Sequence, residues 1–267
     1  MEEDQKKTET LSDIFEKTRT LQIKNVPTFN EDLDRILQGG LEFGQMIQIV
    51  GFPGIGKSQL CMQVACNATL PISLGGCNGV VHYYDSGYNL SLKRVTEISE
   101  CLVKSFPDEV TQDSILSKIE ISRPHSLLTL SASILSLDLL HSPPNVIIID
   151  SFPIFMKQTE ETYRFSAMTT VMTALATYCR SHHALVLVVN NITSKQINTN
   201  YFSSTFNPTP DLKLCFVRSC GIHFSSFFKY FIFLCQPLNK DLTAVVQSPS
   251  FFLPQMCTFQ IFPGGFR

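Results

Sequence analysis

The feature that most constrains this chain is the stretch GFPGIGKS at positions 51–58, which lies between two apolar segments. The residues before it, MIQIV, have the composition of a buried strand, and those after it, QLCMQVAC, have helical periodicity. A turn between a strand and a helix needs one or two glycines, whereas this one has three, followed by a lysine. Glycines allow consecutive backbone N–H groups to point toward one anion, and the start of the helix adds partial positive charge. The stretch therefore predicts a phosphate-binding loop rather than an ordinary glycine turn.

The loop fits the whole pattern G-x-x-x-x-G-K-[ST], which is typical of proteins that bind nucleoside triphosphates. In this pattern the lysine, here Lys57, reaches the β and γ phosphates, and the hydroxyl group of the next residue, Ser58, ligates magnesium. Such a site also needs an acidic residue at the end of a neighbouring apolar strand. Asp150, which follows the run NVIII, is that residue, although an Asp at a strand end is often only a turn former.

Apolar strands and periodic helices alternate along most of the chain. We expect strands ending at residues 50, 85, 121, 150 and 190, with helices near 58–68, 92–102, 127–140 and 165–180 between them. A polar loop over 193–211 and three strands over 227–235, 242–247 and 258–262 follow. The pattern predicts an α/β fold: a mainly parallel twisted sheet with helices on both faces and an antiparallel C-terminal extension.

Composition narrows the class of protein. With 267 residues we expect one substantial domain, a core over 21–267 preceded by a polar lead-in or linker over 1–20. Nine cysteines without a C-x-x-C pair indicate small core residues in a reducing compartment, not a zinc or dithiol site.

The sequence shows no targeting or membrane segment. The N-terminus is no secretory signal, and the most apolar run, 227–235, is too short to span a bilayer, so we expect no membrane contact. A net charge of −2 does not indicate a surface dedicated to coating nucleic acid.

Four segments together resemble one family. They are LDRILQGGLEFGQMIQIVG, the loop continued by Gln59 and Leu60, ATLPISLGG, and the closing SPSFFLPQMCTFQIFPGGFR. They are similar to the eukaryotic RecA-like recombinases, above all the Rad51 paralogues and especially their C-type branch. The resemblance covers about residues 23–267 and implies a RecA-like P-loop NTPase core. The helical N-terminal domain of the family and its Phe-x-x-Ala docking segment are not found in this sequence.

The resemblance implies ATP and Mg²⁺ as cofactors and assigns roles residue by residue. The residues implied to cradle the triphosphate are Gly51, Phe52, Pro53, Gly54, Ile55, Gly56, Lys57, Ser58 and Gln59. Ser58 and Asp150 would serve the magnesium. Arg94 would stack on adenine, unless it is an exposed helix charge, and Asn191 would sense the γ phosphate, unless it is a turn residue.

One departure from the family lies in the sequence YDSGY at positions 84–88. The family pattern is Asp-Thr-Glu-Gly, in which the glutamate orients the attacking water, and Gly87 takes the place of that glutamate. Loss of a positioned general base costs on the order of a hundred- to ten-thousand-fold in rate. We expect Glu97 and Glu100 to face solvent, so that neither replaces it. The chain is therefore predicted to bind ATP with weak or negligible DNA-dependent hydrolysis.

The family also implies contact with single-stranded DNA. The candidate loops are 158–165, with Arg164, and 193–211, with Lys195; Tyr201, Phe202 and Phe206 in the second loop could stack on bases or anchor the loop.

The predicted function is that of a nuclear subunit in homologous-recombination repair, which assembles with other RecA-like subunits and promotes or remodels recombinase filaments. The alternatives are an active ATPase that exchanges strands by itself and, less favoured, a small-molecule kinase of the P-loop class. The partner, and the choice between mitotic repair and meiosis, stay open.

Overall fold

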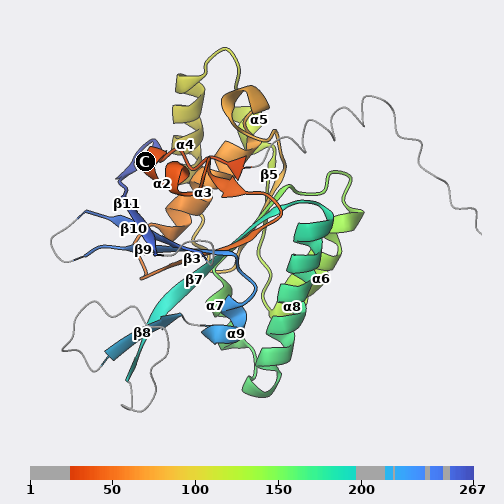
Figure 1. The fold of residues 1–267 in the computed structure, drawn as a ribbon. Helices are drawn as coiled ribbons and strands as arrows, with labels where there is room; N and C mark the ends of the chain where they lie inside the picture. Colours follow the sequence, from red (N-terminus) through yellow and green to blue (C-terminus); the bar gives the residue numbers. More distant parts are fainter. Residues whose placement is uncertain (1–24, 197–213, 219, 238–240, 249–252) are drawn as a thin grey trace, which may run out of the picture.

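The computed structural model describes residues 25–196, 214–218, 220–237, 241–248 and 253–267 (Figure 1). Within these ranges the central element is a nine-stranded sheet of order β11-β10-β9-β3-β7-β6-β4-β5, with β8 paired to β7. Its strands are β3 (Met46–Gly51), β4 (Val81–Asp85), β5 (Ile119–Ser122), β6 (Val146–Asp150), β7 (Leu185–Gln196), β8 (Leu214–Arg218), β9 (Tyr230–Cys235), β10 (Thr243–Gln247) and β11 (Gln255–Thr258).

The pairing pattern confirms the predicted fold class. The six strands from β9 to β5 in that order pair in parallel, whereas β10 and β11 add to the β9 edge in antiparallel fashion. Because the parallel strands share one direction, their carboxyl ends lie along one edge of the sheet, where ligands bind in open α/β folds.

Helices cover both faces of the sheet. They are α2 (Glu31–Ile36), α3 (Lys57–Thr69), α4 (Leu92–Ser105), α5 (Gln112–Leu116), α6 (Leu127–Leu135), α7 (Phe152–Gln158), α8 (Glu161–Ser181) and α9 (Gly221–Ser225). Buried side chains of α3, α4 and α5 pack on one face, and those of α6, α7, α8 and α9 pack on the other. The central strands are apolar at successive positions because both of their faces are covered.

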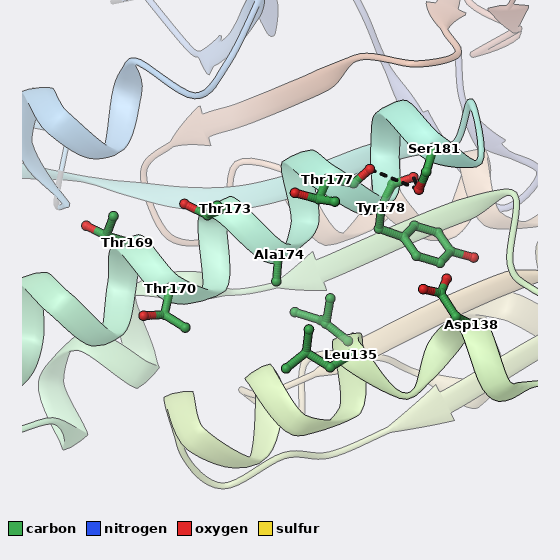
Figure 2. A pocket seen from close by; sticks show the side chains of 10 residues that line it. Leu135, Asp138, Thr169, Thr170, Thr173, Ala174, Thr177, Tyr178 and Ser181 are labelled. Carbon is green, nitrogen blue, oxygen red and sulfur yellow. Dashed lines mark hydrogen bonds between the residues drawn. The ribbon is translucent and has the colours of Figure 1, made fainter.

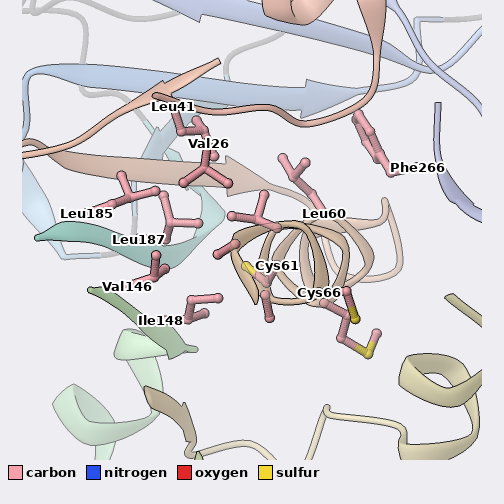
Figure 3. Packing of buried hydrophobic residues seen from close by; sticks show 14 of the residues in the cluster. Val26, Leu41, Leu60, Cys61, Cys66, Val146, Ile148, Leu185, Leu187 and Phe266 are labelled. Atoms are coloured by element: carbon pink, nitrogen blue, oxygen red, sulfur yellow. The ribbon is translucent and has the colours of Figure 1, made fainter. Parts of the chain in front are cut away.

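The face under α3 shows how the cysteines are used (Figure 3). Leu185 and Leu187 of β7 lie in the same apolar cluster as Cys61 and Cys66 of α3, and all four side chains are fully buried. Burial raises the pKa of the Cys66 thiol to about 12, so the group stays protonated at neutral pH. These cysteines are core residues, as the sequence predicts.

The described chain also has two small two-stranded sheets. β1 (Asn25–Val26) pairs with β2 (Leu41–Glu42), and β12 (Ile261–Phe262) pairs with β13 (Gly265–Phe266). The predicted strand over 258–262 is wrong in its bounds. Strand β11 ends at Thr258, and the ring of Phe259, which follows it, is buried against Phe266 at 4.4 Å between centroids, so the chain leaves the sheet there.

Two further predictions differ from the structure. The helix predicted over 127–140 ends at Leu135, and a separate 3-10 turn follows at Leu137–Leu139, where Asp138 binds His182 at 2.6 Å. The loop predicted over 158–165 is mostly helical, since α7 ends at Gln158 and α8 begins at Glu161. Of the predicted loop over 193–211, residues 193–196 continue β7 and the rest lie outside the described residues.

Candidate nucleotide site

The phosphate loop joins β3 to α3 at the carboxyl edge of the sheet. Gly54 and Gly56 have φ angles of 81° and 106°, which disfavour a side chain and turn the loop toward the start of the helix at Lys57. A Cβ atom on Gly56 would lie 2.7 Å from Ile261 Cδ1, so the C-terminal hairpin packs directly on the loop. The predicted strand, glycine loop and helix are therefore confirmed.

Lys57 is the buried cation of the loop, with 7% of its surface exposed. Its ammonium group donates hydrogen bonds to the carbonyl oxygens of Gly51, at 2.9 Å, and Phe52, at 2.8 Å. Burial lowers the pKa of Lys57, while the nearby Asp150 carboxylate acts in the opposite direction. The Lys57 ammonium group is thus stabilised beside the loop by two carbonyl oxygens and by the negative charge of Asp150.

Asp150 ends β6 and is 1% exposed. Its carboxylate accepts hydrogen bonds from the Tyr83 hydroxyl, at 2.9 Å, and from the side chain of Ser58. Burial raises its pKa, Asp85 adds to this effect, and the Ser58 and Tyr83 hydrogen bonds and Lys57 oppose it. A hydroxyl and a carboxylate beside a phosphate loop form a donor set that suits Mg²⁺, which takes few protein ligands and completes its shell with water and phosphate oxygens.

A cavity of about 800 Å³ lies over this group. Its lining residues are Pro53, Gly54, Gly56, Lys57, Ser58, Gln59, Asn89, Arg94, Glu97, Asp150, Ser151, Ile154, Val189, Asn191, Ile261, Phe262 and Pro263. The structure thus brings Arg94, Asp150 and Asn191 together with most of the loop. Gly51, Phe52 and Ile55 belong to the loop but do not line the cavity.

Arg94 is not an exposed helix charge, because only 12% of its side chain is accessible. Nε donates to Gln59 Oε1 at 2.6 Å, and Nη1 donates to Glu97 Oε2 at 3.0 Å and to the Pro263 carbonyl at 2.7 Å. Nη2 donates to the Phe262 carbonyl. Glu97 was predicted to face solvent, but it does so only in part: its side chain is 35% exposed, its carboxylate is paired with Arg94, and it lines the cavity. Glu100, one turn further on, is exposed as predicted.

Gly87 lies beside the cavity. A Cβ atom there would lie 2.5 Å from Asn89 Nδ2 and 2.8 Å from Ile154 Cδ1, and both of these residues line the cavity. A side chain at position 87 would therefore project toward this wall, and the glycine leaves that position without a functional group.

The comparisons with known proteins agree with this geometry. The family model described as Rad51 matches residues 19–210. The chain belongs to the Rad51 family. DNA repair protein RAD51 homolog 2 of Arabidopsis thaliana is 36% identical over 133 residues, which are 48% of this chain and 35% of that protein. DNA repair protein RAD51 homolog 3 of Cricetulus griseus is 28% identical over 268 residues, 90% of this chain and 67% of that protein.

An archaeal relative extends the set. The DNA repair and recombination protein RadA of Methanoculleus marisnigri is 34% identical over 149 residues, 52% of this chain and 44% of that protein. The resemblance to eukaryotic Rad51 paralogues in the RecA-like superfamily is confirmed. The match to the Arabidopsis thaliana protein covers only about a third of that relative's length.

Several site residues of the Rad51-family chain were not predicted. They are Asn89, Glu97, Ser151, Ile154, Val189 and the hairpin residues Ile261, Phe262 and Pro263. The hairpin carries part of the family resemblance, in the segment FQIFPGGFR, but the sequence does not show which pocket it meets. Because the hairpin is far from the phosphate loop in the sequence, no local pattern predicts the contact between them.

Two of the predicted DNA residues, Arg164 and Lys195, belong to α8 and β7. Nε and Nη2 of Arg164 donate to the Thr159 carbonyl at 3.3 and 3.1 Å, which places the guanidinium over the junction between α7 and α8. Lys195 lies in β7, where its backbone is in register with Cys215 of β8. Tyr201, Phe202 and Phe206 lie outside the described residues.

A second cavity, of about 500 Å³, lies between α6 and α8 (Figure 2). The residues that line it are Ile134, Leu135, Asp138, Thr169, Thr170, Thr173, Ala174, Thr177, Tyr178 and Ser181. These are apolar or hydroxyl-bearing side chains with one carboxylate and no lysine or arginine. A triphosphate would meet no cationic side chain there, so this groove is not the nucleotide site.

In the part of the chain that the structure describes, no helix has the length and apolar character needed to cross a membrane.

Proposed function

We propose that this Rad51-family chain binds ATP with Mg²⁺ in the cavity over the phosphate loop. The observation that carries the proposal is the convergence of Lys57, Ser58 and Asp150 from two neighbouring segments on one cavity of about 800 Å³. Lys57 would exchange its two loop carbonyls for phosphate oxygens, with little movement of its backbone at the start of α3. Ser58 and Asp150 would hold Mg²⁺, which would neutralise phosphate charge.

The same site supports slow hydrolysis. A water that attacks the γ phosphate needs a group that orients it and accepts its proton. Gly87 offers no such group, and Glu97, the carboxylate on the cavity wall, is paired with Arg94 at 3.0 Å. Asn191 lines the cavity at the end of the apolar part of β7, where it would meet the γ phosphate and report its presence to the rest of that strand. ATP would therefore act as a binding signal more than as fuel.

The biological role that we infer is in homologous-recombination DNA repair. It rests on membership of the Rad51 family and on the similarity to the relatives described above, which are DNA repair proteins. The chain would work in the nucleus, assemble with other RecA-like subunits and act on recombinase filaments on single-stranded DNA. An active strand-exchange ATPase is the less favoured alternative because of Gly87.

Co-expression with individual RecA-like subunits tests this role. We expect at least one of them to co-purify with the chain, and the yield of the complex to fall when Mg²⁺-ATP is withheld or when Lys57 is replaced by alanine. Recovery of the chain alone with every such subunit, in the presence of ATP, would contradict the assembly role while leaving nucleotide binding to be measured separately.

A further inference from the structure

The turn that follows β4 is fixed against the carboxyl end of β6. Its first residue, Asp85, accepts the backbone N–H of Asn89 at 2.8 Å. The next residue, Ser86, donates its backbone N–H to the Asp150 carbonyl at 3.0 Å and its hydroxyl to the Ser151 carbonyl at 2.8 Å. These hydrogen bonds place the turn beside the acid that we expect to serve Mg²⁺.

Arg123 holds the same turn from its other side. Its Nε pairs with Asp85 Oδ2 at 3.2 Å, and its guanidinium lies over the ring of Tyr88, 5.2 Å from the centroid. The negative charge of Asp85 is thus compensated by Arg123, so it opposes an anion in the neighbouring cavity less than a free carboxylate would. The turn is anchored at three of its residues.

The turn presents the side chain of Asn89 to the cavity. Asn89 is exposed and lines the cavity, and its carboxamide has no hydrogen-bond partner among the residues that the structure describes. A Cβ atom on Gly87 would lie 2.5 Å from Asn89 Nδ2. The carboxamide can occupy this space because residue 87 has no side chain.

The strand order places Asp150 between two carboxamides. Strands β7, β6 and β4 are consecutive in the sheet, and Asp150 of β6 lies opposite Asp85 of β4. Asn191 of β7 lines the cavity on one side of Asp150, and Asn89 lines it on the side of β4. A ligand group held above Asp150 would therefore have an amide side chain on each side.

The charges of the cavity leave room for a neutral donor at this point. Of the described residues that line the cavity, only Lys57 and Arg94 are basic, and the guanidinium of Arg94 is bound to protein acceptors. In the proposed site Lys57 and Mg²⁺ would serve oxygens of the terminal phosphate. An amide N–H can donate to a remaining oxygen, and a hydrogen bond to a charged acceptor is stronger than one between neutral groups.

We propose that Asn89 distinguishes ATP from ADP: its Nδ2 donates to the terminal phosphate, which only ATP carries. This inference rests on the proposed nucleotide site and adds a contact from the β4 side to that of Asn191 from β7. A carboxamide donates a hydrogen bond but is not a general base. The contact therefore holds the phosphate without activating water, as a protein that uses ATP as a signal requires.

The experiment compares nucleotides with and without the terminal phosphate. Affinities for Mg²⁺-ADP and for the Mg²⁺ complex of the β,γ-imido analogue of ATP, which is not hydrolysed, are measured on the full chain by titration calorimetry. Asn89→Leu keeps the size of the side chain and removes its polar atoms, and Asn89→Asp keeps its shape and adds a negative charge. Lys104→Ala, at an exposed position of α4, is the control, and thermal unfolding checks that each variant is folded.

We expect the parent chain to bind the analogue more tightly than ADP. Asn89→Leu should weaken the analogue at least about tenfold, a factor equal to about 1.4 kcal/mol, and ADP less than about twofold. Asn89→Asp should weaken the analogue further, because its carboxylate would repel the terminal phosphate. Lys104→Ala should behave as the parent chain.

Three outcomes would overturn the inference. An equal loss for both nucleotides in Asn89→Leu would show that Asn89 supports the turn and not the phosphate. Unchanged affinity for the analogue in either Asn89 variant would show that the side chain does not contact it, and equal affinities of the parent chain for both nucleotides would show no discrimination. A parent chain that binds neither nucleotide would instead defeat the proposed function itself, so the two failures are distinguishable.

Discussion

Asp85 and Asp150 lie directly opposite each other at the carboxyl ends of β4 and β6, and both are buried, at 0% and 1% exposure. Their surroundings differ. Asp85 accepts the N–H groups of Asn89, at 2.8 Å, and Leu90, at 3.3 Å, and pairs with Arg123 Nε at 3.2 Å. Asp150 has hydroxyl partners and a more distant lysine instead. The first carboxylate is thus built into the turn, whereas the second is available to a cation.

This difference predicts that Asp150→Asn makes the free protein more stable while it weakens Mg²⁺-dependent ATP binding. Burial, with help from Asp85, raises the pKa of Asp150 in the folded chain. A carboxyl group whose pKa is higher when folded lowers the free energy of unfolding at pH values above that pKa, and the penalty disappears as pH falls toward the unfolded value. We therefore expect Asp150→Asn to have a higher free energy of unfolding than the parent chain at pH 8.

Urea unfolding of both proteins from pH 8 down to about pH 4, close to the pKa of an unfolded Asp, measures this effect. The stability difference should shrink as the pH falls, because Asp150 of the parent chain then takes up a proton and Asn has none to take up. If Asp150→Asn is less stable than the parent chain at pH 8, the hydrogen bonds and charges around Asp150 outweigh the cost of burying its carboxylate, which would contradict the prediction.

Gly87→Glu should raise ATP turnover at least about tenfold, because it returns a general base to the wall of the cavity. The new side chain would displace Asn89 Nδ2 and Ile154 Cδ1, which are ends of flexible side chains. Gly87→Gln is the matched control, since it has the same size without the basic carboxylate. Steady-state phosphate release from all three proteins is the measurement, and a similar rise in Gly87→Gln would refute the base argument.

The turn between α2 and β2, which precedes the phosphate loop, offers a test of backbone constraint. Gly40 has a φ of 119°, and a Cβ there would lie 2.4 Å from the carbonyl oxygen of Val26. Gly39 has a similar φ of 112°, but its Cβ would meet only the Asn25 amide, at 3.1 Å. We expect Gly40→Ala to cost more than about 2 kcal/mol of unfolding free energy and Gly39→Ala about 1 kcal/mol. Equal losses in denaturant titrations would contradict the close approach.

The parallel sheet and the phosphate loop could be predicted from sequence because each has a local signature. The run VIIID predicts β6 and its terminal acid, and the spacing of Gly51 and Lys57 predicts the loop and the start of α3. Both signatures need only a few adjacent residues. The positions of Lys57 and Asp150 at one edge then follow from the common direction of the parallel strands.

The rest of the site depends on contacts between distant segments. Glu97 faces the cavity because Arg94 binds the carbonyl of Pro263, 169 residues further on, and no local pattern contains that information. The sequence does not predict α7, because it contains Pro153 and proline usually breaks a helix. In the structure Pro153 lies in the first turn of α7, where proline is tolerated.

The most direct test of the account is the affinity of the purified chain for ATP in the presence of Mg²⁺, measured by titration calorimetry. The parent chain should bind one ATP per chain, and so should the control Lys104→Ala, because Lys104 is an exposed residue of α4 that does not line the cavity. Lys57→Ala should lose at least about 100-fold in affinity, about 2.7 kcal/mol, because the buried ammonium would contact the phosphates. Equal affinities of the parent chain and Lys57→Ala, or no binding by the parent chain, would contradict it.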